Sequence, residues 1–163
     1  MAHSWGVDGG DGVIRIERDP AWWVGIASHP ALIGALYGMP PAAIAPFVTN
    51  PNVLPLAAEH GGFLVMRLDA VGFVYDFHTL FTPEGWGREV AGAAKEAVFE
   101  VMARGARVLT TLQCRDNPRS KPPLSFGFAA VGDWAETQLG EARCWMLTRE
   151  AWEASPARKR MLS

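Results

Sequence analysis

The chain has 163 residues, enough for one domain with a hydrophobic core of its own. Hydrophobic residues make up 49% of the chain and charged residues 20%, and the net charge of −2 excludes a general basic field of the kind that binds nucleic acid. No apolar run approaches the roughly 18 residues of a membrane span, and Cys114 and Cys144 lack metal-ligand spacing, so we expect a reduced, cytoplasmic protein that binds no metal.

Alternating apolar and polar residues predict a first strand over residues 12–18. The glycine-rich segment before it, residues 1–10, lacks this pattern, and we expect it to be flexible. Asp19 followed by Pro20 is typical of a helix start, because Asp accepts bonds from free N–H groups and Pro fits the first helical turn. Residues 39–52 are rich in Pro and Ala and predict a loop with room for one short helical turn.

Three strands are predicted next, near residues 53–59, 62–68 and 73–81. Gly61–Gly62 and residues 69–72 supply the turns between them. Connections of this length join antiparallel neighbours, so the three strands should form a meander.

An amphipathic helix is predicted from about Gly87 to Arg104, because its apolar residues recur at helical spacing. A strand follows near residues 106–113. The order strand, helix, strand favours a right-handed crossover, so this strand should run parallel to the strand at 73–81. After an irregular segment, residues 141–150 predict a last strand.

These elements predict the α/β (α+β) class, with a mixed, mostly antiparallel sheet of about six to seven strands flanked by helices. No change of composition marks a second domain. We therefore expect one domain over residues 11–152, followed by a C-terminal tail at residues 153–163.

The stretch FTPEGWGREV, residues 81–90, places Gly85 and Gly87 between a strand and a helix. A tight turn needs one glycine at most, so a second one suggests that the backbone closely approaches something else. A helix that begins directly after such a turn offers unpaired N–H groups and the positive end of its dipole, which favour a phosphate. The alternative is a glycine-rich turn that only packs the helix on the sheet.

The six residues from Thr82 to Gly87 resemble the turn motif of the GNAT superfamily of acyl-CoA-dependent acyltransferases, with Thr82 in place of the usual Gln or Arg. Asn117, Ser120 and Gly127–Phe128 resemble a later signature of the same family, one residue short. The resemblance implies a parallel strand pair that splays around the cofactor arm.

The resemblance covers about residues 11–150. Three shorter matches, at residues 29–30, 58–64 and 78–88, are similar more narrowly to a GNAT-like subfamily often encoded by phages and prophages.

The family resemblance implies acetyl-CoA as the cofactor. The N–H groups around Gly85 and Gly87 would hold the pyrophosphate, and Arg88, which opposes the helix dipole in the first turn, would face the bound anion. Trp86 would stack on the cofactor or contact a partner chain. The residues assigned to the cofactor are Leu80, Phe81, Thr82, Gly85, Trp86, Gly87, Arg88 and Asn117, of which Leu80 to Thr82 would pair their backbone with the pantetheine arm.

Acyl transfer to an amine needs a base for the amine proton. His78 is the first candidate, because it lies on the strand before the turn and an imidazole titrates near pH 6.5. Asp76 lies on the same strand face by period two and would orient His78 or act as the base through water. The alternatives are a structural histidine in the sheet and a charge on a solvated strand face.

The departing thiolate also needs a proton. Many enzymes of the family place a Tyr seven residues after the Asn, where this chain has Leu124. Ser120, Ser125 and Cys114 remain as donors, although a thiol of pKa about 8.5 can leave without an enzyme acid.

Three hypotheses follow. The first is an N-acetyltransferase that moves an acetyl group from acetyl-CoA to an amine of a small molecule or a protein, with no membrane or nucleic-acid partner and with a homodimer allowed. The second is a non-catalytic module of the same fold that binds an acyl-CoA or a partner protein. The third is a phage-type group transferase that modifies a nucleic-acid base.

Overall fold

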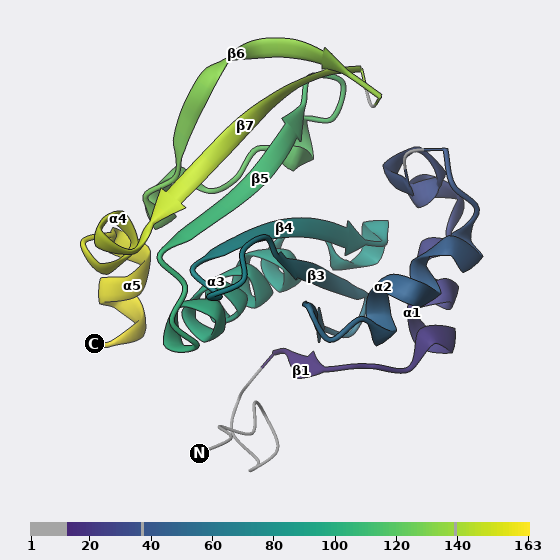
Figure 1. Cartoon of the computed structure of the whole chain (residues 1–163), viewed down its shortest axis with the longest axis horizontal. Helices are drawn as coiled ribbons and strands as arrows, with labels where there is room; N and C mark the ends of the chain where they lie inside the picture. The colour runs from purple at the N-terminus through teal and green to yellow at the C-terminus, as the bar shows by residue number, and fades with distance from the viewer. Residues whose placement is uncertain (1–12, 37, 139) are drawn as a thin grey trace. The chain divides into compact units, whose positions relative to one another are not determined.

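The computed structural model describes residues 13–36, 38–138 and 140–163 (Figure 1). The chain divides into two compact units. The first unit comprises Met1–Met66 and Thr79–Val98, and the second comprises Arg67–His78 and Phe99–Ser163. The segment predicted to be flexible, residues 1–10, lies outside the described residues, and the single domain over residues 11–152 stays a prediction.

The strands form one seven-stranded mixed sheet in the order β1-β2-β3-β4-β5-β7-β6. β4 and β5 pair in parallel, from Val74 opposite Val108 to Phe77 opposite Thr111, as the crossover predicted. The predicted splaying of these strands beyond Phe77 stays a prediction. The strand bounds are β1 (Arg15–Ile16), β2 (Val53–Ala57), β3 (Gly61–Arg67), β4 (Val74–Phe81), β5 (Val108–Cys114), β6 (Ala129–Thr137) and β7 (Gly140–Thr148).

Helices flank the sheet, which confirms the predicted fold class (Figure 1). The Asp19 side chain accepts a bond from the Ala21 nitrogen at 2.9 Å and caps α1, with Pro20 in its first turn, as predicted. The α-helices are α1 (Pro20–Ala27), α2 (Ala45–Thr49), α3 (Arg88–Ala103), α4 (Arg149–Glu153) and α5 (Pro156–Met161), and the 3₁₀ helices are η1 (Pro30–Leu36), η2 (Pro41–Ile44), η3 (Pro83–Gly85), η4 (Pro118–Ser120) and η5 (Leu124–Phe126).

No single helix among these is both long enough and apolar enough to cross a membrane. One bent pair, Pro30–Leu36 with Pro41–Thr49, reaches that length and apolarity only when its two members, 57° apart, are taken together.

The core of the first unit lies between its N-terminal helices and its strands. Trp23 is fully buried, and its indole nitrogen donates to the Glu17 carbonyl at 2.7 Å. The other buried members of this core are Ala27, Leu36, Ile44, Val48, Val53, Ala57, Leu64 and Leu80.

The second unit has a core of its own, in which the Phe126 ring packs edge-on against Trp152 at 5.7 Å between centroids. The Arg149 guanidinium donates to the carbonyls of Met102 and Ala106, both at 2.6 Å, and so satisfies carbonyls at the end of α3.

Two segments predicted as loop or turn are instead helix and strand. Residues 39–52 are not mainly loop, because Pro41 and Pro46 lie in the first turns of η2 and α2, where proline favours a helix. Gly61–Gly62 do not form a turn but begin β3. The glycine at position 62 serves close packing, because a Cβ there would lie 2.8 Å from the Trp23 ring.

β6 is absent from the predicted elements, since the irregular segment was expected to run directly into the last strand. Its nine residues, Ala129–Thr137, are nearly all exposed and so lack the alternation that marks a half-buried strand. β6 instead forms by antiparallel pairing with β7, with a register shift between Val131 and Ala135. In the segment predicted as a tail, Pro156–Met161 form α5, which the buried Ser155 caps.

Candidate active site

The turn between β4 and α3 is tied to the turn that joins β2 (Val53–Ala57) to β3 (Gly61–Arg67). The Thr82 nitrogen donates to the His60 carbonyl at 2.9 Å, and the Gly85 nitrogen donates to the Thr82 carbonyl at 3.0 Å. Of the backbone predicted to pair with pantetheine, the Thr82 N–H is therefore already bonded inside the protein. The side chains of Leu80 and Phe81 are fully buried.

Gly85 is required by packing. It is buried, and a Cβ at this position would overlap the Glu89 carboxylate and lie 2.7 Å from the Phe81 ring. A side chain here would displace both groups. This glycine therefore fits the alternative in which the turn packs α3 against the strand.

Gly87 differs from Gly85 in both conformation and surroundings. Its φ is +105°, a left-handed conformation that side chains disfavour, and no heavy atom lies within 4 Å of the place where a Cβ would stand. Its carbonyl accepts the first helical bond of α3, from Ala91 at 3.0 Å. The first helical residue, Arg88, is exposed. The start of α3 therefore combines an open glycine, free first-turn N–H positions and a cation, which suits an anionic group.

Trp86 braces this turn from within. Its indole nitrogen donates to the Phe81 carbonyl at 3.2 Å, and its ring stands edge-on to the Phe81 ring at 6.4 Å. The half-buried indole therefore has an intramolecular role that neither sequence interpretation, cofactor stacking or a partner contact, included.

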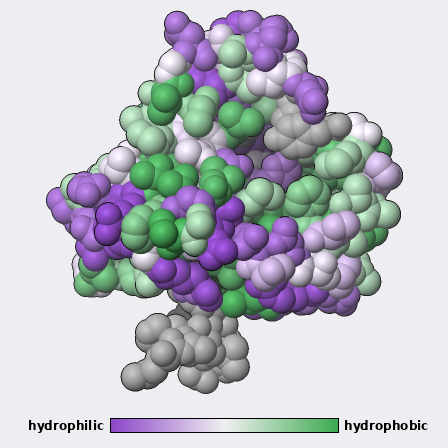
Figure 2. Space-filling view, in the orientation of Figure 1, coloured by the Kyte–Doolittle hydropathy of each residue, from purple (hydrophilic) through white to green (hydrophobic). Residues whose placement is uncertain are grey.

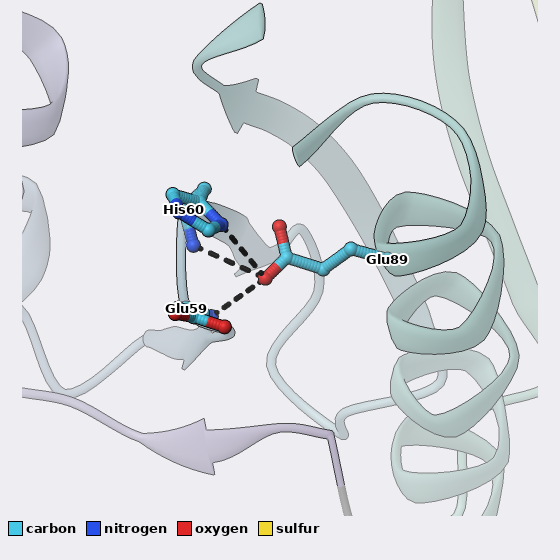
Figure 3. Close-up of side chains that lie close together, drawn as sticks. All are labelled: Glu59, His60 and Glu89. Atoms are coloured by element: carbon cyan, nitrogen blue, oxygen red, sulfur yellow. Dashed lines mark hydrogen bonds and ion pairs between the residues drawn. The ribbon is translucent and has the colours of Figure 1, made fainter. Parts of the chain in front are cut away.

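Glu89 is a residue that the sequence analysis did not single out (Figure 3). One oxygen of its carboxylate, Oε1, accepts from the backbone nitrogens of Glu59 at 3.1 Å and His60 at 3.2 Å. The same oxygen lies 3.4 Å from His60 Nδ1. The only local signal is an acid in the first turn of a helix, which normally indicates an interaction with that helix's own N–H groups.

The ligand atoms of Glu59, His60 and Glu89 lie within 4.8 Å of one another, a separation that a metal ion could bridge. However, two backbone N–H groups point at Glu89 Oε1 and already neutralise part of its charge. A cation at that oxygen would face the positive ends of the same two dipoles. The geometry therefore favours a structural role, in which Glu89 ties the turn at residues 58–60 to α3, over a metal site.

Asp76 and His78 lie on β4 within the second unit, both half-buried. Because they are two residues apart on a strand, their side chains share one face of the sheet. The Asp76 carboxylate accepts a bond from the Thr110 hydroxyl at 2.7 Å, across the parallel pair. Burial raises the pKa of Asp76, and the Thr110 hydrogen bond opposes that rise.

Cys114 and Cys144 are free thiols on the neighbouring strands β5 and β7. Burial raises the pKa of both, with further contributions from Asp116 for Cys114 and from Asp76 for Cys144. Each therefore remains a protonated thiol at neutral pH, which keeps Cys114 a candidate proton donor and excludes a ready thiolate.

The residues after β5 organise a turn. The Ser120 hydroxyl accepts from the Cys114 nitrogen at 2.8 Å and donates to the Asn117 carbonyl at 2.6 Å. Asn117 caps η4 by accepting from the Arg119 nitrogen at 3.1 Å. Leu124, where the family resemblance expects a Tyr on a helix, is exposed on the short η5.

The predicted site residues are divided between the two units. Asp76, His78 and Asn117 belong to the second unit, and the others belong to the first. Those in the first unit are Leu80, Phe81, Thr82, Gly85, Trp86, Gly87 and Arg88.

This architecture is the fold of GNAT-family acetyltransferases. Spermidine N-acetyltransferase from Vibrio cholerae, solved with CoA and spermine, has a TM-score of 0.67 and 11% identity over 86% of this chain and 96% of its own. A probable GNAT-family acetyltransferase from Chromobacterium violaceum has a TM-score of 0.68 and 14% identity over 89% of this chain and 92% of its own.

A third similar structure is the aminoglycoside acetyltransferase AAC(6')-Ib in complex with coenzyme A. It has a TM-score of 0.67 and 16% identity, covering 91% of this chain and 98% of its own. No protein-family model matches the chain, and no curated protein matches it. The likeness at this level of identity concerns the fold.

Proposed function

We propose that the protein is an acetyl-CoA-dependent N-acetyltransferase acting on an amine. The observation that carries the proposal is the start of α3, where Gly87 adopts a φ of +105° beside open space in which a Cβ would stand. Two proteins of this fold, the spermidine N-acetyltransferase and AAC(6')-Ib, have been solved with CoA or acetyl-CoA. Gly87, Arg88 and the first-turn N–H groups of α3 fit the pyrophosphate of that cofactor.

When bound, acetyl-CoA would supply the acetyl group as a reactive thioester. The amine nitrogen forms a bond to the acetyl carbonyl carbon while the bond from that carbon to sulfur breaks. The proton lost by the amine passes to the Asp76 carboxylate or the His78 imidazole, which share one face of β4. The raised pKa of Asp76 makes its carboxylate a stronger base than an ordinary aspartate.

The leaving thiolate regains a proton from water or from a donor in the protein. Cys114 suits this role better than Ser120, because the Ser120 hydroxyl proton is directed at a backbone carbonyl. A thiol of ordinary pKa, about 8.5, leaves without such help.

The finer assignments belong to the same proposal. The acceptor would be a small-molecule amine, because the similar proteins bind spermine and paromomycin-type aminoglycosides. A cytoplasmic location, a homodimer and membership of the phage-type subfamily are further parts of it. The subfamily rests on residues 29–30, 58–64 and 78–88.

A second candidate is a non-catalytic acyl-CoA-binding module. The observation that favours it is Leu124, an exposed aliphatic side chain on a three-residue 3₁₀ helix where many enzymes of the fold carry the acid. Such a module would bind CoA or acetyl-CoA but would not cleave acetyl-CoA.

The test is release of free CoA thiol when the protein is mixed with acetyl-CoA and a panel of primary amines. We expect thiol release that depends on an amine and produces the matching N-acetyl product. CoA binding with no amine-dependent release would support the module, and neither binding nor release would reject both candidates.

A further inference from the structure

The face of the sheet that carries Asp76 can be followed strand by strand through the second unit. Residues that lie directly opposite each other in paired strands point to the same face. Asp76 is opposite Thr110, Thr110 is opposite Met146, and Met146 is opposite Ala129. These four residues form one row across β4, β5, β7 and β6.

The adjacent row is apolar. Leu112 is opposite Cys144, and Cys144 is opposite Val131. Leu112 is 39% exposed and Val131 47% exposed, so this row presents hydrocarbon to solvent beside Asp76. Further rows on the same face are Val74, Val108 and Thr148 on one side, and Cys114, Ala142 and Ala135 on the other.

Charge is distributed unevenly between the two faces. Among the positions of this face whose register is described, Asp76 is the one carboxylate, and His78, two residues further along β4, shares the face with it. Glu141 and Arg143 of β7 alternate with Ala142 and Cys144 and therefore point to the opposite face. There the Arg143 guanidinium lies 5.0 Å from the ring of Trp145.

We propose that the acceptor is a monoamine with an apolar or aromatic body, which places its nitrogen at Asp76 and its body on Leu112, the member of the adjacent row that lies one strand away. This inference rests on the proposed function, because the amine must reach a base on this face within hydrogen-bond distance or through one water. A single carboxylate matches a single ammonium group.

A polycation is a poorer match for this face. Each of its ammonium groups that leaves water requires an anionic or hydrogen-bonding partner, and the described rows offer one carboxylate. An apolar body gains free energy by covering Leu112. The acceptor class would therefore differ from spermine and the aminoglycosides that similar proteins bind.

The space-filling view (Figure 2) shows that apolar and polar side chains are interspersed on the surface drawn. On the face drawn in Figure 2, hydrophobic side chains occur in several small groups between hydrophilic ones. A small ligand, rather than an extended apolar partner, suits an apolar group of this kind.

The test compares 2-phenylethylamine and hexylamine with spermidine and kanamycin in the thiol-release assay. Binding of 2-phenylethylamine to the protein saturated with CoA, measured by calorimetry, gives a second readout that needs no transfer. We expect kcat/KM for 2-phenylethylamine to exceed that for spermidine by roughly tenfold or more.

A substitution localises the effect. Leu112→Asp, at a residue that is 39% exposed on β5, should raise the KM and the dissociation constant for 2-phenylethylamine by roughly tenfold. Val71→Asp, at a residue that is 68% exposed in the turn before β4, is the matched control and should change neither.

The outcomes separate the inference from the proposed function. Preference for spermidine or kanamycin, or equal effects of Leu112→Asp and Val71→Asp, would overturn the apolar-acceptor inference while leaving the acetyltransferase in place. Thiol release with none of the amines would overturn the acetyltransferase proposal itself.

Discussion

Glu89 Oε1, in the first turn of α3, lies 3.2 Å from the backbone nitrogen of His60, 29 residues earlier in the chain. The carboxylate therefore supplies an acceptor to two backbone N–H groups of the turn between β2 and β3. Its second oxygen, Oε2, is buried against Gly85 without a hydrogen-bond partner. The turn at residues 58–60 and the start of α3 are held together by one side chain.

Glu89→Ala should destabilise the protein by about 1–2 kcal/mol, because it removes the acceptor of two backbone N–H groups. The melting temperature should fall by about 2–8 °C. The measurement is thermal unfolding followed by circular dichroism. Glu59→Ala is the control, since the Glu59 side chain is exposed, and an equal loss in the control would contradict the assigned role.

Gly87→Ala should abolish most of the stabilisation by CoA. At about 100 times Kd, CoA should add roughly 2.7 kcal/mol to the wild type, which corresponds to a rise of roughly 5–10 °C in melting temperature. Alanine would place a methyl group in the open space at the start of α3.

The matched control for that substitution is Gly105→Ala. Gly105 also has a left-handed φ, +104°, and no heavy atom within 4 Å of a Cβ, but it lies at the C-terminal end of α3. Both variants should lose about 1–2 kcal/mol from backbone strain, and only Gly87→Ala should lose the CoA shift. Loss of the shift in both variants would assign the effect to strain.

Asp76→Asn should make the protein more stable than the wild type at neutral pH. Burial raises the pKa of Asp76, so the folded state favours the protonated carboxyl. The stabilising contribution of that group is complete below its unfolded pKa and is lost as the pH rises through its folded pKa. The asparagine side chain has no carboxyl to ionise, so the variant does not lose this stability as the pH rises.

The check is the free energy of unfolding in urea for both proteins between pH 4 and pH 8. The advantage of Asp76→Asn should grow as the pH rises and vanish toward the acid end. A constant difference across this range would show that the carboxyl titrates at its ordinary pKa in the folded protein.

His78→Ala should lower kcat by roughly 10²–10⁴ if the imidazole is the base, with the CoA-induced melting shift unchanged. If Asp76 is the base instead, Asp76→Asn should show that loss and His78→Ala should not. The two variants, assayed for thiol release with the best amine, therefore assign the base between these residues.

The elements with strong local signals were predictable. The Asp19 cap, the strand and the helix on either side of the FTPEGWG turn and the parallel return of β5 all follow from residue patterns within a few positions. β6 was not predictable in this way, because its exposed residues acquire strand geometry only by pairing with β7.

The candidate site was likewise predictable only in part. The sequence placed Gly85 and Gly87 in one turn, but their different roles depend on Phe81 and Glu89 packing around the first and on open space at the second. The bonds from Glu59 and His60 to Glu89 join segments about 30 residues apart. No local pattern encodes such a contact.

Each of the two units contains a tryptophan that is buried. Trp23 in the first unit is 0% exposed, and Trp152 in the second is 1% exposed. Indole fluorescence shifts to longer wavelength when water reaches the ring, so each residue is an optical reporter of its own unit. Proteins with Trp23→Phe or Trp152→Phe would reveal, by comparison of their emission during denaturation, whether the chain melts in one step or in two.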